Sequence, residues 1–148
     1  MGNEHWEHRQ KQLKILNASL CTVFVLSYLL MLLFAWKDST ALLLRMLSLS
    51  ATAFLLVSLI RYLVAAPRPS TEEAKKKRSH SFPSRHTFSA FYLAALAFRF
   101  STAASILLYV AAICMGATRV FWGLHHKKDV VAGAALGVLL AVLSLLLM

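Results

Sequence analysis

Acidic side chains are scarce in this sequence. Only six Asp and Glu residues stand against 16 Lys and Arg residues in a chain of 148. Asp129 is the one acid that lies among the histidines and arginines of three short motifs, at residues 61–69, 83–86 and 118–129. A two-metal catalytic site requires several carboxylates close together, so the sequence does not favour one. A zinc site is not favoured either, because the adjacent His125 and His126 have no third and fourth ligand at useful spacing. We therefore predict no metal and no cofactor.

Cysteines and linker residues are also few. The two cysteines, Cys21 and Cys114, both fall inside apolar runs, which favours small buried side chains over a disulfide or a redox motif. No stretch rich in Pro, Gly or Ser divides the chain, and no internal repeat is present. We expect residues 1–148 to form a single domain.

Apolar residues dominate what remains. They make up 59% of the chain, with a mean hydropathy of +0.65, which is rare in a soluble domain. A helix needs about 20 mostly apolar residues to cross a bilayer. Five runs are candidates, at residues 15–36, 41–60, 84–98, 103–118 and 130–148. The sequence thus predicts an all-α integral-membrane bundle of five to six helices, a multi-pass protein of the cell membrane in contact with the lipid bilayer.

The sixth helix in this prediction is a polar segment, residues 4–14, ahead of the first run. Trp6, Leu13 and Leu16 share one helical face there, which is typical of an amphipathic helix at the interface. A frayed polar tail is the alternative. Trp6, Trp36 and Trp122 are predicted to be interfacial anchors. On the last two spans small residues recur at a spacing of four, which permits close helix packing; the pairs are Ala112 with Gly116 and Gly133 with Gly137.

Basic residues are distributed unevenly between the two ends of the predicted bundle. If the spans alternate, 13 Lys and Arg residues lie at the end that carries the N-terminus and residues 61–85 and 119–129, and 3 lie at the other end. Nucleic acid is a poor partner for this charge, because most of the chain is apolar and no reading helix or aromatic platform accompanies it. An anionic lipid is the better partner. The basic run at residues 75–78 is predicted to be a solvated loop that attracts such lipid.

The first of two polar clusters extends from Arg61 to His86. Arg61 and Arg68 flank the exit of the second span, and Pro83 precedes the third span at a position that suits a helix start. Ser84, Arg85 and His86 then fall in the first helical turn. Free backbone N–H groups and the positive end of the helix dipole make such a turn a natural anion site.

The second cluster follows the fourth span. It reads Thr118-Arg119, five residues, His125, three residues and Asp129. His125 and Asp129 are four apart and would share one helical face, so the carboxylate can accept the imidazole N–H and fix its tautomer. The other ring nitrogen is then free to act as a nucleophile or base. Arginines suit phosphate because they bind it bidentately and stay charged.

Together these residues resemble the type 2 phosphatidic acid phosphatase superfamily of membrane lipid phosphatases. The family has three blocks: Lys, six residues, Arg-Pro; then Pro-Ser-Gly-His; then Ser-Arg, five residues, His, three residues, Asp. Here the blocks are 61–69, 83–86 and 118–129, in the same order and with the same internal spacing. Arg61 replaces the family lysine, Arg85 the glycine and Thr118 the serine. The family usually has six spans, and five are predicted here.

The resemblance implies a metal-independent lipid phosphatase. By this analogy His125 attacks phosphorus to form a phosphohistidine, Asp129 orients it, and His86 protonates the leaving oxygen and then activates water. The phosphoryl oxygens would be held by Arg61, Arg68 and Arg119, with Ser84 and the backbone N–H of Arg85 beside them. Arg85 could also bind a second phosphate or headgroup, or point to solvent.

Several alternatives stay open at this point. The candidate substrates are phosphatidate, phosphatidylglycerophosphate and polyprenyl diphosphates of the undecaprenyl type. A non-catalytic protein that binds or transports anionic lipid is the competing functional class. The excess of basic residues predicts a cytoplasmic active end, whereas the resemblance implies the outer face.

Overall fold

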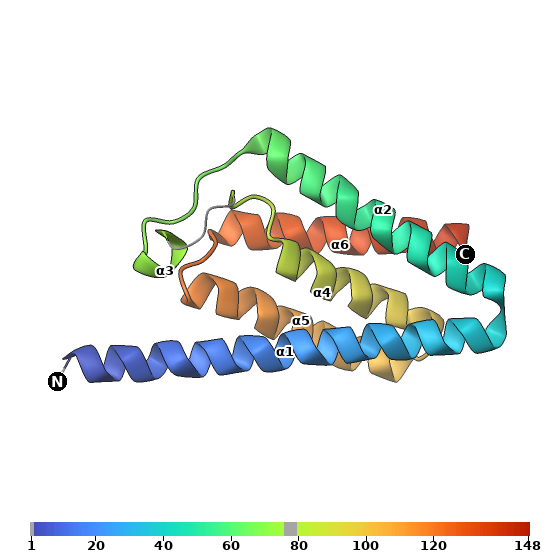
Figure 1. The fold of residues 1–148 in the computed structure, drawn as a ribbon, viewed down its shortest axis with the longest axis horizontal. Helices are drawn as coiled ribbons and strands as arrows, with labels where there is room; N and C mark the ends of the chain where they lie inside the picture. The colour runs from blue at the N-terminus through green and yellow to red at the C-terminus, as the bar shows by residue number, and fades with distance from the viewer. Residues whose placement is uncertain (1, 76–79) are drawn as a thin grey trace.

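The protein is an all-α bundle, and its longer polar loops lie together at one end (Figure 1). The computed structural model describes residues 2–75 and 80–148, and side chains from residue 7 onward except those of 72 and 73. Lys76, Lys77 and Arg78 of the predicted basic loop, and the side chain of Trp6, lie outside this part. The elements are α1 (Gly2–Asp38), α2 (Thr40–Val64), α3 (Glu72–Lys75), α4 (Arg85–Leu96), the 3-10 turn η1 (Ala97–Arg99), α5 (Thr102–Phe121) and α6 (Lys127–Leu147).

The N-terminal segment does not form a separate interfacial helix. Residues 2–14 continue into the first predicted span as one helix, α1. No proline and no glycine occurs between Asn3 and Asp38 to end the helix, so propagation costs little once α1 has started. The break comes at Ser39, whose side chain caps α2 by accepting a hydrogen bond from the backbone N–H of Leu42 at 3.0 Å.

The third predicted span forms a helix, but a short one. At 12 residues α4 is about 18 Å long, against about 30 Å of hydrocarbon. Within the described residues, four helices are long and apolar enough to cross a membrane: α1 from Glu7, α2, α5 and α6. The polar start of α4 is sheltered by protein, because Ser84 and Thr87 are fully buried. Hydropathy alone cannot distinguish such an inner helix from a span.

Helix α4 lies at the centre of the bundle and packs mainly on α6 and α5. Close approach to α6 depends on the predicted small residues: a Cβ at Gly133 would meet the carbonyl oxygen of Ser84 at 2.6 Å, and one at Gly137 would meet that of Phe88 at 2.6 Å. The prediction of tight packing at this pair is confirmed. Two backbones in van der Waals contact hold the start of α4 against the start of α6.

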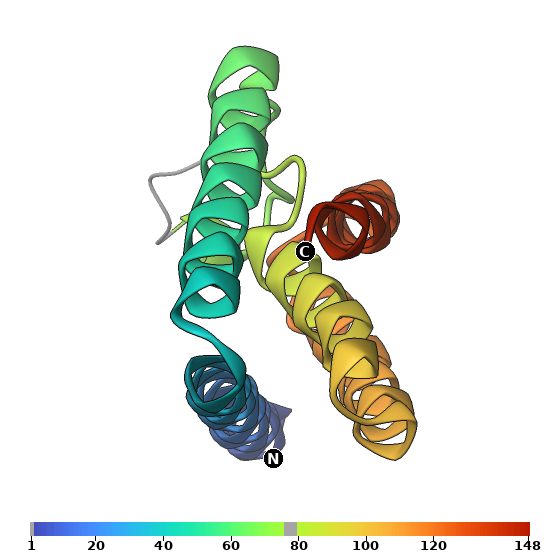
Figure 2. The same cartoon turned by 90° about the vertical axis from the view of Figure 1, so that its right-hand side faces the viewer.

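The two ends of the bundle differ in kind. Figure 2 looks onto the end that carries the α1–α2 connection and the C-terminus. Arg99 pairs with Asp38 there at 3.7 Å, and Nη1 of Arg45 donates to the carbonyl oxygen of Met148 at 3.2 Å. The opposite end carries the N-terminus, the α2–α4 connection and the α5–α6 connection (Figure 1). The predicted alternation of the loops between two ends is therefore confirmed.

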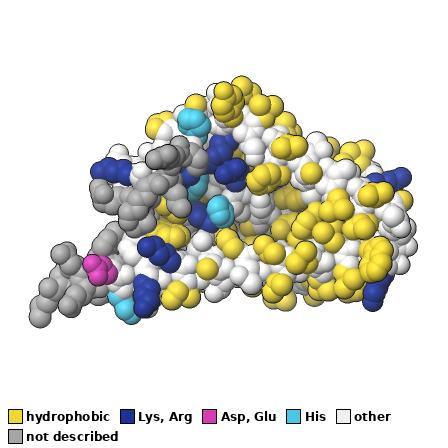
Figure 3. Space-filling model, in the orientation of Figure 1, with side chains coloured by type: hydrophobic (Ala, Val, Ile, Leu, Met, Phe, Trp, Pro, Cys, Tyr) yellow, Lys and Arg dark blue, Asp and Glu magenta, His cyan; other side chains and the backbone are white. Residues whose placement is uncertain are grey.

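Much of the outer surface is apolar, as a lipid-facing surface must be. Large hydrophobic side chains on all four long helices are exposed, Leu107 at 70% and Leu146 at 78% among them. On the face in Figure 3 basic and histidine side chains gather toward the polar end, and hydrophobic side chains cover most of the rest. Both cysteines are free; Cys21 is half-buried, but Cys114 is exposed on α5. Its predicted burial is wrong, because an apolar run in a membrane helix has a lipid-facing side as well as a protein-facing one.

Candidate functional site

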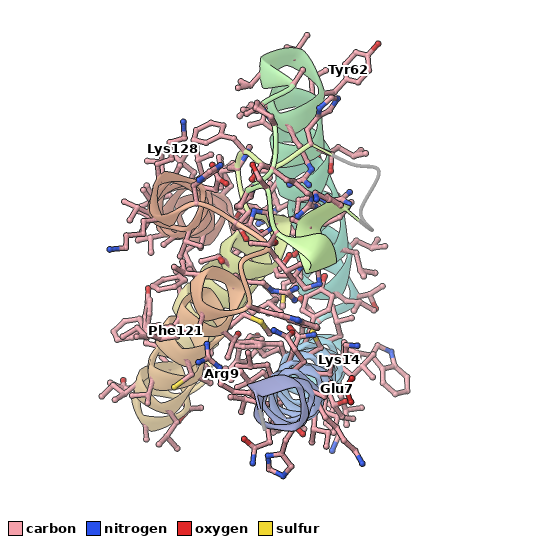
Figure 4. The ribbon with its side chains drawn as sticks, turned by 90° about the vertical axis from the view of Figure 1, so that its left-hand side faces the viewer. Glu7, Arg9, Lys14, Tyr62, Phe121 and Lys128 are labelled. Atoms are coloured by element: carbon pink, nitrogen blue, oxygen red, sulfur yellow. The ribbon has the colours of Figure 1, made fainter. Side chains whose placement is uncertain are left out.

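The polar clusters converge on one cavity at the polar end of the bundle. Figure 4 looks onto this end, with Tyr62, Phe121 and Lys128 around its outside. The cavity has a volume of about 270 Å³. Four helices and two loops contribute to its wall, which consists of Asn17, Arg61, Arg68, Arg85, His86, Arg119, Trp122, Leu124 and His125. Segments more than 100 residues apart in sequence thus surround a single space.

Two of the arginines also fix the loops around the cavity. Arg61 is buried in the last turn of α2, and its Nη1 donates to the carbonyl oxygens of Ser81 at 3.1 Å and Pro83 at 2.8 Å. Nη1 of Arg68 donates to the carbonyl oxygen of Leu124 at 2.8 Å. The first bonds hold the segment before α4, and the second holds the loop before His125. These arginines therefore position both histidines as well as lining the cavity.

His125 is buried, and its Nδ1 faces two other side chains. Its Nδ1 lies 3.6 Å from Oδ2 of Asp129, beyond hydrogen-bond distance, and 3.4 Å from Oγ of Ser81. Ser81 donates a short hydrogen bond to the same Oδ2, which also accepts from the backbone N–H of His126 at 2.9 Å. Since Nδ1 faces Ser81 and Asp129, Nε2 is the ring nitrogen left for chemistry at the cavity.

The environment keeps the imidazole neutral. Burial, followed by the positive charges of Arg68 and Arg61, lowers the pKa of His125 to about 4, although the charge of Asp129 opposes the shift. Burial also lowers the pKa of Arg68, which still remains a cation at neutral pH. A lowered histidine pKa means that the neutral form persists down to about pH 4. A nucleophilic nitrogen requires that neutral form.

Replacement of Arg68 by glutamine is expected to raise the pKa of His125 toward the ordinary value for histidine, because the cation with the largest lowering effect on that pKa is removed. The titration can be followed by NMR of protein labelled at its histidine rings in detergent micelles. Arg45→Gln, at the opposite end of the bundle, is the matched control and should leave the pKa of His125 unchanged. A wild-type His125 that titrates near pH 6.5 would contradict the electrostatic argument.

Polar atoms on the α1 and α5 side of the cavity are buried without a partner. They are Nε of Arg119, Nε1 of Trp122 and Oδ1 of Asn17. Nη2 of Arg119 contacts the sulfur of Met115 at 3.9 Å. A buried donor left unpaired costs about 1–3 kcal/mol, more when it is charged. The N–H donors of Arg119 and Trp122 therefore favour an anionic ligand with several acceptor oxygens, whereas Oδ1 of Asn17 is itself an acceptor.

Of the remaining predicted site residues, two line the cavity and two are buried behind its wall. His86 is exposed and Arg85 half-exposed, and both line the cavity. Ser84 is brought close but does not line it: Ser84 is fully buried, its Oγ lies 3.0 Å from that of Thr87, and its N–H donates to the carbonyl oxygen of Asp129 at 3.0 Å. Asp129 is likewise fully buried, behind His125. The cavity wall is thus made by the cations and histidines, with Ser84 and Asp129 in a layer behind.

Four contributions could not be read from the sequence. Ser81 contacts both Asp129 and His125, and Asn17 and Trp122 line the cavity. Trp122 was predicted to be an interfacial anchor, yet its indole nitrogen is buried. Gly123 adopts a φ of +67°, and its carbonyl oxygen accepts a hydrogen bond from the hydroxyl of Thr71 at 2.8 Å. Two features of the sequence could have indicated these contributions: Asn17 lies at the start of an apolar run, and Gly123 lies between Arg119 and His125.

No metal-ligand cluster is visible among the side chains that the structure describes: no three His, Cys, Asp or Glu residues come together there. The residues that line the cavity instead include four arginines and two histidines.

The sequence pattern of the PAP2 superfamily matches residues 41–148, which contain every block of the candidate site. The chain belongs to the PAP2 superfamily. Bacitracin transport permease protein BcrC of Bacillus licheniformis is 44% identical over 62 residues, which cover 42% of this chain and 30% of that protein. The matched segment is thus under a third of the length of that relative.

Two solved structures share the fold of this PAP2 chain. A transmembrane PAP2 type phosphatidylglycerolphosphate phosphatase from Bacillus subtilis superposes with a TM-score of 0.70 at 22% identity, over 93% of this chain and 75% of that one. LpxE of Aquifex aeolicus superposes with a TM-score of 0.66 at 25% identity, over 88% and 86% of the two chains. The similarity includes α1, which lies outside the matched sequence pattern.

Proposed function

We propose that this PAP2 protein is a membrane phosphatase that hydrolyses a phosphate ester or diphosphate of a lipid without a metal, through a phosphohistidine. One observation carries the proposal. Nδ1 of the buried His125 faces Ser81 and Asp129, which leaves the other ring nitrogen for a cavity that four arginines line. Positioning and electrostatic stabilisation of this kind are the usual means of phosphoryl transfer.

The proposed chemistry has two steps. Nε2 of His125 attacks phosphorus, the bond from phosphorus to the ester oxygen breaks, and His86 gives a proton to that oxygen. Water then attacks phosphorus, His86 takes a proton from it, and the bond from phosphorus to nitrogen breaks. Arg61, Arg68 and Arg119 would neutralise the oxygens throughout both steps.

A lipid is the proposed substrate class because apolar grooves adjoin the polar cavity. Arg85 and His86 line both the cavity and a groove of about 300 Å³ formed with Cys21, Val25, Phe54, Ser89 and Met115. Phe54 and Ser89 in turn line a further groove of about 380 Å³ that reaches Tyr92 and Leu93. A lipid chain in these grooves would place its phosphate at the histidines. Because Asn17 of α1 also lines the cavity, we propose that residues 1–148 act as one domain.

The proposal is tested by release of inorganic phosphate from lipid phosphates in detergent, with a chelator present throughout. Phosphatidate, phosphatidylglycerophosphate and a polyprenyl diphosphate are offered separately. We expect turnover of at least one substrate and, after rapid quenching at alkaline pH, a labelled protein whose phosphate is lost in acid. Turnover that depends entirely on added divalent metal would contradict the proposal.

A further inference from the structure

Arg85 stands where the polar cavity meets the apolar groove. It is the first residue of α4, beside His86, and it lines both spaces. Its guanidinium lies over the ring of Phe54, 5.7 Å from the ring centroid. Such a cation–π contact orients the side chain without consuming its N–H donors in the ring plane. Arg85 is therefore held at the junction rather than directed into solvent.

The cavity carries more positive charge than one phosphate needs. Four guanidinium groups line it, and Asp129 is the acid that acts on Arg61 and Arg68. Arg85 adds a repulsive charge close to those same two arginines. A phosphomonoester brings at most about two negative charges. A headgroup with a second phosphoryl group brings about three, which balances the four cations and the single acid.

Space and hydrogen-bonding capacity also exceed a single phosphoryl group. The cavity of about 270 Å³ equals roughly nine water molecules at ~30 Å³ each. Unpaired N–H donors of Arg119 and Trp122 lie on its α5 side, while Arg85 approaches from α4. Donors on two sides of one space suit a ligand with two groups of acceptor oxygens.

We propose that Arg85 binds a second phosphoryl group of the substrate, so that the preferred headgroup carries two phosphoryl groups. This inference rests on the proposed lipid phosphatase activity. Two kinds of lipid carry two phosphoryl groups. In a lipid diphosphate the groups are adjacent, and in a glycerol-linked headgroup a phosphodiester lies beyond the cleaved monoester. The arms of the experiment distinguish them.

The experiment compares kcat/KM for a lipid monophosphate and for the diphosphate with the same chain, in the wild type and in Arg85→Gln. Loss of a charge-assisted bond should lower kcat/KM for the diphosphate about 10- to 100-fold more than for the monophosphate. Arg85→Lys should restore part of the difference. Arg119→Gln is the matched control, since it is expected to lower both values by the same factor and leave their ratio in place.

Phosphatidylglycerophosphate and phosphatidate form the second pair of substrates. A selective loss confined to the diphosphate pair assigns adjacent phosphoryl groups, and one confined to the glycerol pair assigns separated groups. An Arg85→Gln protein that loses both members of both pairs equally overturns the inference while the phosphatase activity stands. A wild-type protein that cleaves none of the four lipids overturns the proposed function instead.

Discussion

Replacement of His125 by alanine is expected to abolish phosphate release while lipid binding persists. In the proposed mechanism the imidazole supplies the attacking nitrogen, and deletion of a catalytic nucleophile lowers kcat on the order of 10⁴- to 10⁶-fold. The guanidinium groups of Arg61, Arg68 and Arg119 are untouched by the change, so the affinity for a lipid phosphate should change less than about tenfold. Phosphate release reports the first effect, and equilibrium binding of a radiolabelled lipid phosphate in detergent reports the second.

The neighbouring histidine offers a matched control. The side chain of His126 is exposed; its backbone N–H donates to Oδ2 of Asp129, and its carbonyl oxygen accepts from the N–H of Asp129. His126→Ala keeps that N–H, so its turnover should stay within about fivefold of the wild type. The His125→Ala protein should also give no acid-labile phosphate label. Undiminished release by His125→Ala would end the nucleophile assignment, and wild-type binding without any turnover would favour the competing class, a non-catalytic lipid-binding protein.

The convergence of the motif blocks could be predicted from the sequence because it follows from two simple regularities. Apolar runs alternate between the ends of a bundle, and the block spacing fixes which residues stand at each run's polar end. His86, His125 and the four arginines consequently line one cavity. The family pattern also located the one acid in the site, Asp129. Their catalytic roles stay a prediction.

Which serine contacts His125 and which aromatic residue lines the cavity depend on how the helices and loops pack, and the sequence could not show this. Ser84 pairs with Thr87, whereas Ser81 contacts Asp129 and His125. The sequence could not distinguish the two serines, because both are the same residue type in or beside the same motif. An aromatic residue at the end of a span is usually an interfacial anchor. Trp122 instead lines the cavity, in a turn where Gly123 takes a left-handed conformation and Leu124 donates back to the carbonyl oxygen of Arg119.

The packing of α4 on α6 leads to the second large expected effect, in Gly133→Ala. The added Cβ would lie 2.6 Å from the carbonyl oxygen of Ser84 and 3.3 Å from the backbone nitrogen of Phe88. Both are backbone atoms, so no side-chain rotation relieves the overlap and the helices must separate. Overpacking typically lowers the free energy of unfolding by about 1–3 kcal/mol, and we expect a loss near the upper end of that range because the contact is with backbone. Thermal unfolding in detergent measures the loss of stability.

We also expect a large loss of activity in this variant, because the proposed acid–base residue His86 lies on α4 and the proposed orienting residue Asp129 lies on α6. His86 stands in the first turn of α4 and Asp129 in the first turn of α6, and the N–H of Ser84 joins the two starts through the carbonyl oxygen of Asp129. A displacement of about 1 Å at a catalytic site costs on the order of 10²-fold in rate. Ala135→Leu adds more volume to the exposed side of the same helix and should change neither property. A Gly133→Ala protein with wild-type unfolding and wild-type turnover would show that α4 does not depend on this contact for its position.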